Sequence, residues 1–501
     1  MIFSAHARAI RGVALAISGA VALAPVLLAP NEVAPTRLAS AVNVAAPAAV
    51  PAAASGISIE LAWERTLSKK KPVWFSSPGV ATLDGKGASV IVGDTAGKVW
   101  AFHTSDGSRV AGWPYSTKGV RVMSTPAVSG TGKKTRVFVG VGSSAAPTKG
   151  GYLALNYKGD KAWYHSPYLL PGNKGGKRGV MSSMAVGNIR TGSDVIGGAM
   201  GQMQSAFTAK KGKTLAGFPW LMADTNFSTP ALANVFGKKR DYIFEGGDST
   251  AGSSSVSTYK SGGHIRILKP TGNLRESWPD RGLKCEATTN QVVQSSPAVG
   301  KFLAHGRLGV VTGTGIFYKH RSDTNRIIAI NGSCKRIWSK KLDGATRPSP
   351  ALVDLTGNGT LEVVTMSEKG TVYALSGPSG KKIWTRKLGH GTDGSVTTFQ
   401  APGADFQYVL APAGQGVYLL DGRDGSIVKR ISNFRLRSSA TVTADPDGSI
   451  GITVAGATTV KHKSIGIIQH FRVVGSSVTT VQTKGAWPMF HHDPQLTGYA
   501  K

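Results

Sequence analysis

The chain has 501 residues, of which 17% are charged and 64 are glycine. So few charged residues, together with so much glycine, argue against long exposed helices and favour a turn-rich β protein. The 59 Lys and Arg against 27 Asp and Glu give a net charge of +32, which attracts polyanions. Two cysteines are too few for a disulfide-dense scaffold or a Cys-based metal cluster.

The N-terminal residues have the layout of a secretory signal peptide. Arg8 and Arg11 precede an apolar run over residues 12–29, and Ala39-Ser40-Ala41 supplies the small residues of a cleavage site. An uncleaved membrane anchor is the alternative, but its Gly, Ala and Pro content makes the run a weak span. We expect residues 1–41 to be removed, which leaves 56 basic and 26 acidic residues and a net charge of +30.

Residues 42–56 are rich in Ala and Pro and are predicted to be a linker. Residues 57–501 are predicted to form one domain, because a single pattern returns throughout them: a small-residue start, then short apolar runs separated by Gly-containing turns. The clearest copy has its four strand-like runs at 348–354, 361–366, 370–375 and 382–388.

Repeats of this length with about four strands are typical of a β-propeller. We therefore predict an all-β fold of about eight four-stranded blades, with seven as the alternative because two copies are faint. The unit starts lie at Ser77-Pro78, Thr125-Pro126, Ser183-Met184, Thr229-Pro230, Ser296-Pro297, Ser349-Pro350 and, more weakly, near Thr397 and Ser439.

A strand at the N-terminal end of the domain has no blade of its own. Residues 61–67, with Trp63, resemble the Trp-bearing runs 336–342 and 382–388, yet they precede the first unit. An open ring would leave a strand edge exposed, so we predict that residues 61–67 complete the last blade. The recurring Trp63, Trp338 and Trp384 are expected to pack between blades rather than to form a sugar-binding platform.

Two family resemblances follow from these residues. Residues 349–364 resemble an FG-GAP (VCBS-type) repeat of integrin-α-like propellers and secreted bacterial proteins. The Trp-bearing strands and the motif over residues 487–498 are similar to pyrroloquinoline-quinone-like (PQQ-like) propellers, in which that motif usually stands before the first blade. The resemblance covers roughly residues 57–501; it implies a propeller and leaves the function open.

The loop of the clearest repeat is a candidate calcium site. The resemblance suggests that side chains at alternate positions, with one backbone carbonyl, act as oxygen ligands of Ca²⁺. A turn whose polar side chains bond their own backbone is the alternative, and the sequence leaves both open. Other copies place Lys86 or Lys301 at ligand positions, which excludes calcium there. The candidate ligands are Asp354, Thr356, Asn358, Glu362 and the carbonyl of Thr360.

No motif points to catalysis. Gly-x-Ser-x-Gly, His-Glu-x-x-His and phosphate-loop patterns are absent. The quinone dehydrogenases of the superfamily have adjacent cysteines at the cofactor, whereas Cys285 and Cys334 lie 49 residues apart, so no PQQ is expected. In an exported protein these cysteines are expected to form a disulfide, joining the approach to one blade with the outer strands of that same blade.

The basic residues are spread in pairs and triplets over predicted loops and outer strands. Anionic cell-envelope or extracellular polymers, nucleic acid, or no specific partner would each be compatible with this charge. Aromatic residues are not interleaved with the basic runs, so specific nucleic-acid binding is not expected. The first candidate for an anion site is the triplet Lys238, Lys239 and Arg240, with solvated loop charge as the alternative.

The sequence therefore predicts a secreted or cell-surface, monomeric, non-catalytic β-propeller. It would bind anionic polymers or a protein partner as an adhesion or interaction module, with calcium as a candidate stabiliser. The alternative is an exported enzyme whose carboxylates line the central channel. A cluster of carboxylates with shifted pKa values at the channel mouth would favour that alternative.

Overall fold

The computed structural model describes residues 57–144, 146, 148–169, 177–251, 260–271, 282–319, 321–460, 462–481 and 485–500, without the side chains of the last two. The predicted signal peptide and linker lie outside the described residues. No described helix is long and apolar enough to span a membrane.

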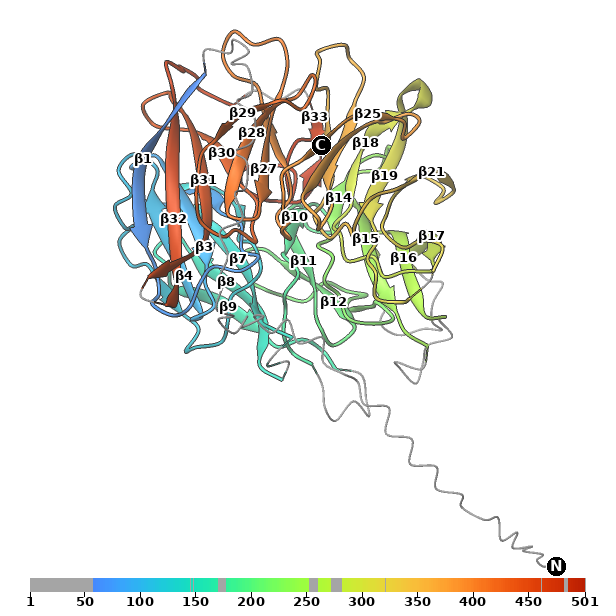
Figure 1. The fold of residues 1–501 in the computed structure, drawn as a ribbon. Coiled ribbons are helices and arrows are strands. Elements are labelled where there is room, and N and C mark those ends of the chain that lie inside the picture. The colour runs from blue at the N-terminus through green and yellow to red at the C-terminus, as the bar shows by residue number, and fades with distance from the viewer. Residues whose placement is uncertain are drawn as a thin grey trace, which may run out of the picture. The chain divides into compact units, whose positions relative to one another are not determined.

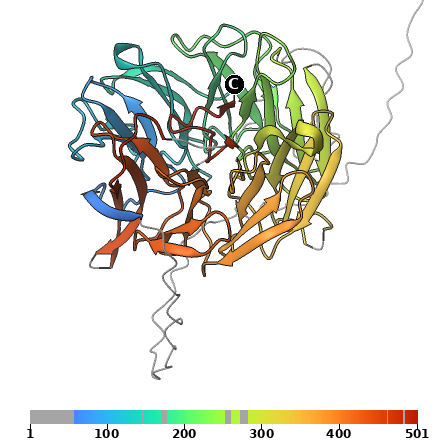
Figure 2. The same ribbon diagram turned by 90° about the horizontal axis from the view of Figure 1, so that it is seen from above.

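Eight mainly antiparallel sheets form a β-propeller, which confirms the predicted fold and the larger of the two blade numbers (Figures 1 and 2). In blades 1–7 the chain passes outward through four consecutive strands. The described helices are two 3₁₀ turns, η1 (Gly132–Lys134) and η2 (Ala304–Gly306).

The strands of blades 1–4 are β2 (Gly79–Thr82), β3 (Ala88–Gly93), β4 (Lys98–His103) and β5 (Tyr115–Ser116); β6 (Ala127–Ser129), β7 (Arg136–Gly142), β8 (Gly150–Asn156) and β9 (Lys161–His165); β10 (Ala185–Gly187), β11 (Asp194–Gly198), β12 (Met203–Thr208) and β13 (Trp220–Leu221); and β14 (Ala231–Ala233), β15 (Tyr242–Ser249), β16 (Gly262–Leu268) and β17 (Leu283–Thr289).

The strands of blades 5–8 are β18 (Ala298–Leu303), β19 (Arg307–Gly313), β20 (Arg326–Asn331) and β21 (Arg336–Lys341); β22 (Ala351–Val353), β23 (Glu362–Met366), β24 (Thr371–Ser376) and β25 (Lys382–Lys387); β26 (Thr397–Phe399), β27 (Tyr408–Ala413), β28 (Gly416–Asp421) and β29 (Ile427–Arg430); and β30 (Thr441–Ala444), β31 (Ile450–Val460), β32 (Lys463–Val474) and β1 (Ser58–Thr66).

The N-terminal strand closes the ring, as predicted. β1 pairs antiparallel with β32, and Trp63 lies opposite His470. Their rings stack with centroids 5.2 Å apart. Blade 8 thus takes three strands from one end of the domain and its outermost strand from the other, so the ring has no open junction between first and last blade.

Hydroxyl groups link the starts of the blades around the axis. At seven of the eight junctions, the backbone N–H of one unit start donates to the side-chain hydroxyl of the next, at 2.8–2.9 Å; we call these residues the hydroxyl ring. The donor and acceptor pairs are Ser77 to Thr125, Thr125 to Ser183, Ser183 to Thr229, Thr229 to Ser296, Ser349 to Ser395, Ser395 to Ser439 and Ser439 to Ser77.

Tryptophans of the outermost strands join neighbouring blades, as predicted. The Trp63 indole donates to the Thr104 carbonyl in blade 1 at 2.8 Å, and its ring covers Gly107, where a Cβ atom would meet it at 2.5 Å. Gly107 has φ +67°, so glycine suits both the close approach and the backbone conformation. Equivalent indole bonds run from Trp163 to Ala209, Trp338 to Gly377 and Trp384 to Gly422.

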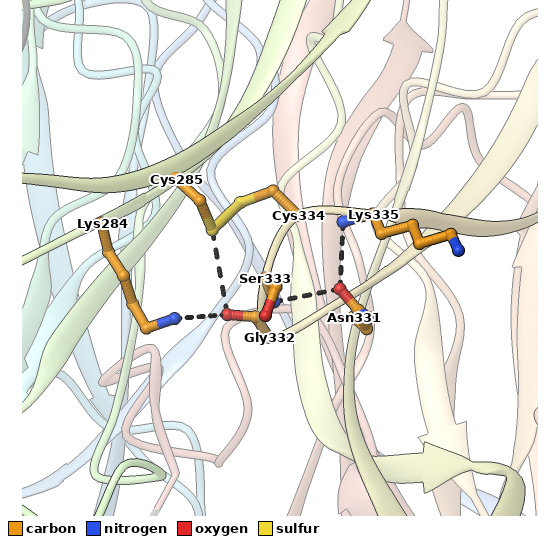
Figure 3. Close-up of a disulfide and its surroundings, with 7 residues drawn as sticks. All are labelled: Lys284, Cys285, Asn331, Gly332, Ser333, Cys334 and Lys335. Atoms are coloured by element: carbon orange, nitrogen blue, oxygen red, sulfur yellow. Dashed lines mark hydrogen bonds between the residues drawn. A yellow bond between two sulfur atoms is a disulfide. The ribbon is translucent and has the colours of Figure 1, made fainter.

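A disulfide takes the place of this contact between blades 4 and 5. Cys285 lies in β17 at the register position that Trp338 has in β21, and it bonds Cys334 in the turn between β20 and β21 (Figure 3). The Cα atoms are 5.7 Å apart. The predicted pairing is confirmed, but its placement within one blade was wrong, because residue 285 belongs to the outermost strand of the preceding blade. The bond therefore connects two blades.

Candidate functional site

The propeller has two faces that the topology makes distinct. Every inner strand begins after the hydroxyl ring and runs in the same sense, so the loops that lead into inner strands share one face, here called the entry face. The loops that follow inner strands, here called the A–B loops, share the opposite exit face. A strand rises about 3.3 Å per residue, so two residues five positions apart in an inner strand are separated by about 16 Å from the entry face toward the exit face.

The C-terminal segment, residues 485–500, lies against the inner strands around the axis (Figure 2). It includes β33 (Gly485–Trp487), which pairs with β22, and β34 (Tyr499–Ala500), which pairs with β14. Backbone carbonyls of residues 488–498, between β33 and β34, accept hydrogen bonds from N–H groups of five inner strands. Each donor lies three residues after the hydroxyl-ring member of its blade. These donors are Val80, Val128, Val186, Leu232 and Thr398. The segment therefore satisfies backbone groups that the inner strands would otherwise leave unpaired.

The segment is held by its own polar contacts. The Asp493 carboxylate accepts the Thr497 N–H at 3.0 Å and the Thr497 hydroxyl. His491 is buried and its Nδ1 bonds the Leu496 carbonyl. Burial lowers the pKa of His491 to about 4.

Eight residues at the entry face occupy one position, two residues before each member of the hydroxyl ring; we call them the axial ring. In blades 1–4 they are apolar, and in blades 5–8 they are polar or charged. In blade order they are Phe75, Met123, Met181, Phe227, Gln294, Arg347, Asp393 and Arg437.

The charged half of the axial ring is a continuous ionic network across blades 6, 7 and 8. Arg347 Nε lies 3.0 Å from Glu368 Oε1, and its terminal nitrogen lies 3.4 Å from Asp393. Arg437 bonds the other oxygen of Asp393 at 2.7 Å through Nε. The same guanidinium stacks over Phe75, 4.3 Å from the ring centroid, so the network reaches the apolar half in blade 1.

Two carboxylates of the entry face have raised pKa values. Asp248, at the end of β15, bonds Gln294 of the axial ring at 3.0 Å. Burial raises the pKa of Asp248 to about 7, and the nearby charge of Asp224 adds to this shift. Burial also raises the pKa of Glu368. Raised carboxylate pKa values at this face are one part of what a catalytic site at the channel mouth would require, but no contact joins Asp248 to Glu368 in the described part of the chain.

The exit face has a different character, because the A–B loops of blades 1–4 are basic. Seven exposed or partly exposed cations lie in these loops, and none is in an ion pair within the described part of the chain. The A–B loops of blades 5–8 contain no Lys or Arg. We call the seven residues the basic crescent: Lys86, Lys133, Lys134, Arg190, Lys238, Lys239 and Arg240.

Hydrogen bonds connect the loops of the basic crescent. The Thr135 hydroxyl of blade 2 donates to the Thr82 carbonyl of blade 1 at 3.1 Å. The Asn188 amide of blade 3 donates to the Lys239 carbonyl of blade 4 at 2.9 Å. The predicted triplet at 238–240 is exposed, and these bonds place it in a row with the basic loops of its neighbours rather than alone.

The predicted calcium loop follows β22 on the exit face. Asp354 accepts backbone N–H groups from Gly357, Asn358 and Gly359 at 2.8–3.0 Å. Glu362 accepts the Leu355 N–H at 2.8 Å, and burial raises its pKa to about 7. Thr356 and Thr360 are exposed. These backbone bonds are the ones that the turn interpretation expects, and calcium binding at this loop remains a prediction.

The axial ring and its ionic network were not predicted from the sequence. The sequence does contain a signal for them, because the residue two positions before each member of the hydroxyl ring is Phe or Met in four units and Gln, Arg, Asp and Arg in the next four. Asp248 and Glu368 were not predicted either, because the long insertion after β15 and the short turn after β23 share no motif. The prediction named a single basic triplet, whereas the repeat places the basic A–B loops of blades 1–4 side by side.

Comparison with known proteins agrees with the fold. The family model of the outer membrane protein assembly factor BamB matches residues 269–449, just over a third of the chain. No curated protein matches the chain. BamB from Moraxella catarrhalis superposes with a TM-score of 0.50 at 13% identity, over 82% of this chain and all of that one. Quinohemoprotein alcohol dehydrogenase from Comamonas testosteroni superposes with a TM-score of 0.55 at 12% identity, over 84% of this chain and 77% of that one.

The likeness to a quinoprotein raises the question of whether the residues fit a quinone. The adjacent cysteines that the resemblance associates with the cofactor have no counterpart, because the two cysteines of the chain join β17 of blade 4 to the turn between β20 and β21 of blade 5. These residues do not fit that cofactor site. The chain has the fold of the PQQ-like β-propellers.

Proposed function

We propose that this protein is an exported β-propeller that binds an anionic polymer of the cell envelope along the basic crescent. The observation that carries the proposal is the row of cations on four consecutive A–B loops, none of them in an ion pair within the described part of the chain. Fixed, closely spaced cations gain affinity from a polyanion because binding releases the counterions of both partners. The predicted signal peptide and the BamB description of the matching family model support an envelope location.

The repeat architecture favours an extended ligand over a compact one. Each blade presents its basic loop at the same distance from the axis, so the cations follow an arc rather than converge on one point. A flexible chain of phosphates or carboxylates can follow such an arc, whereas a single small anion would meet one loop. We therefore favour a polymer such as poly(glycerol phosphate) or a polyuronate.

The test is the binding of fluorescently labelled poly(glycerol phosphate), followed by fluorescence anisotropy. The variant with Lys133, Lys134, Lys238 and Lys239 changed to Ala is expected to bind at least about ten-fold more weakly, because four phosphate contacts are lost. Neutral dextran of equal length is the control ligand and is expected not to bind. An unchanged affinity in the variant would contradict the proposal.

A second candidate is an exported enzyme with its site at the entry face. The specific observation in its favour is the raised pKa of Asp248 and Glu368, which is the property of a general acid. Against it, Glu368 is bound by Arg347 at 3.0 Å. Hydrolysis of envelope polysaccharide that is lost in Asp248→Asn would support this candidate, and hydrolysis that is unchanged in the variant would contradict it.

A further inference from the structure

The entry face contains a group of carboxylates in a chain that is otherwise strongly basic. Asp224 precedes the inner strand of blade 4, Asp248 ends β15 of that blade, and Glu368 lies in the turn after β23 of blade 6. We propose that this sector binds an ammonium or guanidinium group on an apolar stem, such as the side chain of a lysine or arginine.

Asp248 has a buried carboxylate oxygen that makes no hydrogen bond to any residue that the structure describes. The residue is 6% exposed, and one carboxylate oxygen accepts the Gln294 amide at 3.0 Å. The other, Oδ1, is buried and has no hydrogen-bond partner among the described residues. A buried carboxylate oxygen without a partner costs free energy, and a cation or a donor that reaches it recovers that cost.

The arginines of the axial ring form their ion pairs with other carboxylates. Arg347 bonds Glu368 and Asp393, and Arg437 bonds Asp393 from the other side, although the charge of Arg347 also lowers the pKa of Asp248. These two arginines and the four carboxylates of Asp224, Asp248, Glu368 and Asp393 have a formal charge of −2 when all are ionised, and Arg321, over the Tyr318 ring, is a further cation beside them. An added cation would neutralise part of this charge, whereas the rest of the protein repels it.

Aromatic and apolar side chains stand beside Asp248. The Tyr318 hydroxyl donates to the carbonyl of Ser249, the next residue along β15, at 2.9 Å. Phe317 contacts Tyr318 edge to face and is 56% exposed, and Ile316 is 53% exposed. The Arg321 guanidinium lies over the Tyr318 ring, 5.5 Å from its centroid, which shows that a cation is accepted on this aromatic pair. The exposed Phe317 ring offers a second face that attracts an organic cation and covers its methylene stem. A metal ion would gain nothing from these apolar groups.

The test uses isothermal titration calorimetry with the peptide acetyl-Gly-Phe-Lys-Phe-Gly-amide. Its counterpart with Nε-acetyl-lysine keeps the shape and removes the charge. We expect the lysine peptide to bind and the acetylated peptide to bind at least ten-fold more weakly. Asp248→Asn keeps the bond to Gln294 and is expected to lower the affinity about ten-fold, and Phe317→Ala is expected to lower it by a smaller factor.

Asp405→Asn is the matched control, because it removes an exposed carboxylate on the exit face and is expected to leave the affinity unchanged. Hexylamine distinguishes a free amine from a lysine side chain as the source of the ammonium group. If hexylamine and the lysine peptide bind with equal affinity, the site is assigned to free amines, and if the peptide binds more tightly, the site is assigned to polypeptide side chains. Equal binding of both peptides, or an unchanged affinity in Asp248→Asn, would overturn the proposal. None of these outcomes depends on polyanion binding at the basic crescent.

Discussion

The backbone N–H of Ser439 donates to the hydroxyl of Ser77 at 2.9 Å, which joins the last blade to the first across 362 residues of sequence. Ser77 in turn donates its own N–H to Thr125 of the next blade at 2.9 Å. One small residue thus accepts a hydrogen bond from one neighbour and donates one to the other. The bond recurs at seven of the eight junctions, which explains why the unit starts are Ser or Thr.

Ser77→Ala should lower the stability of the whole domain. The substitution leaves the buried N–H of Ser439 without its acceptor, which costs about 1–3 kcal/mol. Thermal unfolding followed by circular dichroism measures the change. Ser333→Ala, an exposed serine in a turn of blade 5, is the control and should leave the melting temperature unaltered. Equal melting temperatures for the parent and Ser77→Ala would show that the ring of hydroxyls contributes nothing.

The disulfide should stabilise the junction between blades 4 and 5. Replacing Cys285 and Cys334 by Ser is expected to destabilise by about 4 kcal/mol, since the bond closes a loop of about 50 residues. The informative second variant is Cys285→Trp with Cys334→Gly, which introduces the tryptophan and glycine found at other junctions. It should recover part of the loss in melting temperature. No loss in the double serine variant would contradict this account of the junction.

Calcium should raise the melting temperature if the loop after β22 binds it, because a ligand bound only to the folded state stabilises that state. The shift should vanish in Asp354→Ala, since Asp354 is the first carboxylate of the loop. Magnesium at equal concentration controls for ionic strength. A shift that persists in the variant, or none at millimolar calcium, would leave the loop as a turn closed by its backbone bonds.

Acid should loosen the C-terminal segment through His491. Its pKa is about 4 in the folded protein and near 6.5 when exposed, so the unfolded state binds the proton first. Stability is therefore complete above pH 6.5 and falls as the pH drops toward 4, by about 3 kcal/mol from this residue. His491→Asn, which tolerates the positive φ of this position, should show a smaller decline in melting temperature between pH 6.5 and 4.5. Identical pH profiles for the parent and the variant would show that His491 does not cause the loss of stability in acid.

The repeat pattern made the fold predictable, because each blade buries its strands only against its neighbours and so repeats the same apolar runs. The strand around Trp63 could be placed in the last blade because it had the right sequence and no sheet of its own. The blade to which Cys285 belongs could not be predicted in the same way. Its strand, β17, is preceded by a long insertion, so the sequence does not show that β17 is the outermost strand of blade 4.

The ionic network on the entry face could not be predicted from any single segment. Arg347, Asp393 and Arg437 are about 45 residues apart in sequence and belong to different blades. Only the closed ring places them together, and no local motif distinguishes them from solvated loop charges. The role of Asp248 could not be predicted from its own segment either, because its burial depends on the neighbouring blade that supplies Gln294.

The most direct test of the proposed function is the salt dependence of poly(glycerol phosphate) binding in two matched variants. One changes Lys238, Lys239 and Arg240 of the basic crescent to Ala, and the other changes Lys69, Lys70 and Lys71, an exposed triplet on the entry face. Both remove three charges. The crescent variant should bind more weakly and reduce the slope of log affinity against log salt by about 2, whereas the entry-face variant should stay near the parent. Equal losses in the two variants would contradict the account.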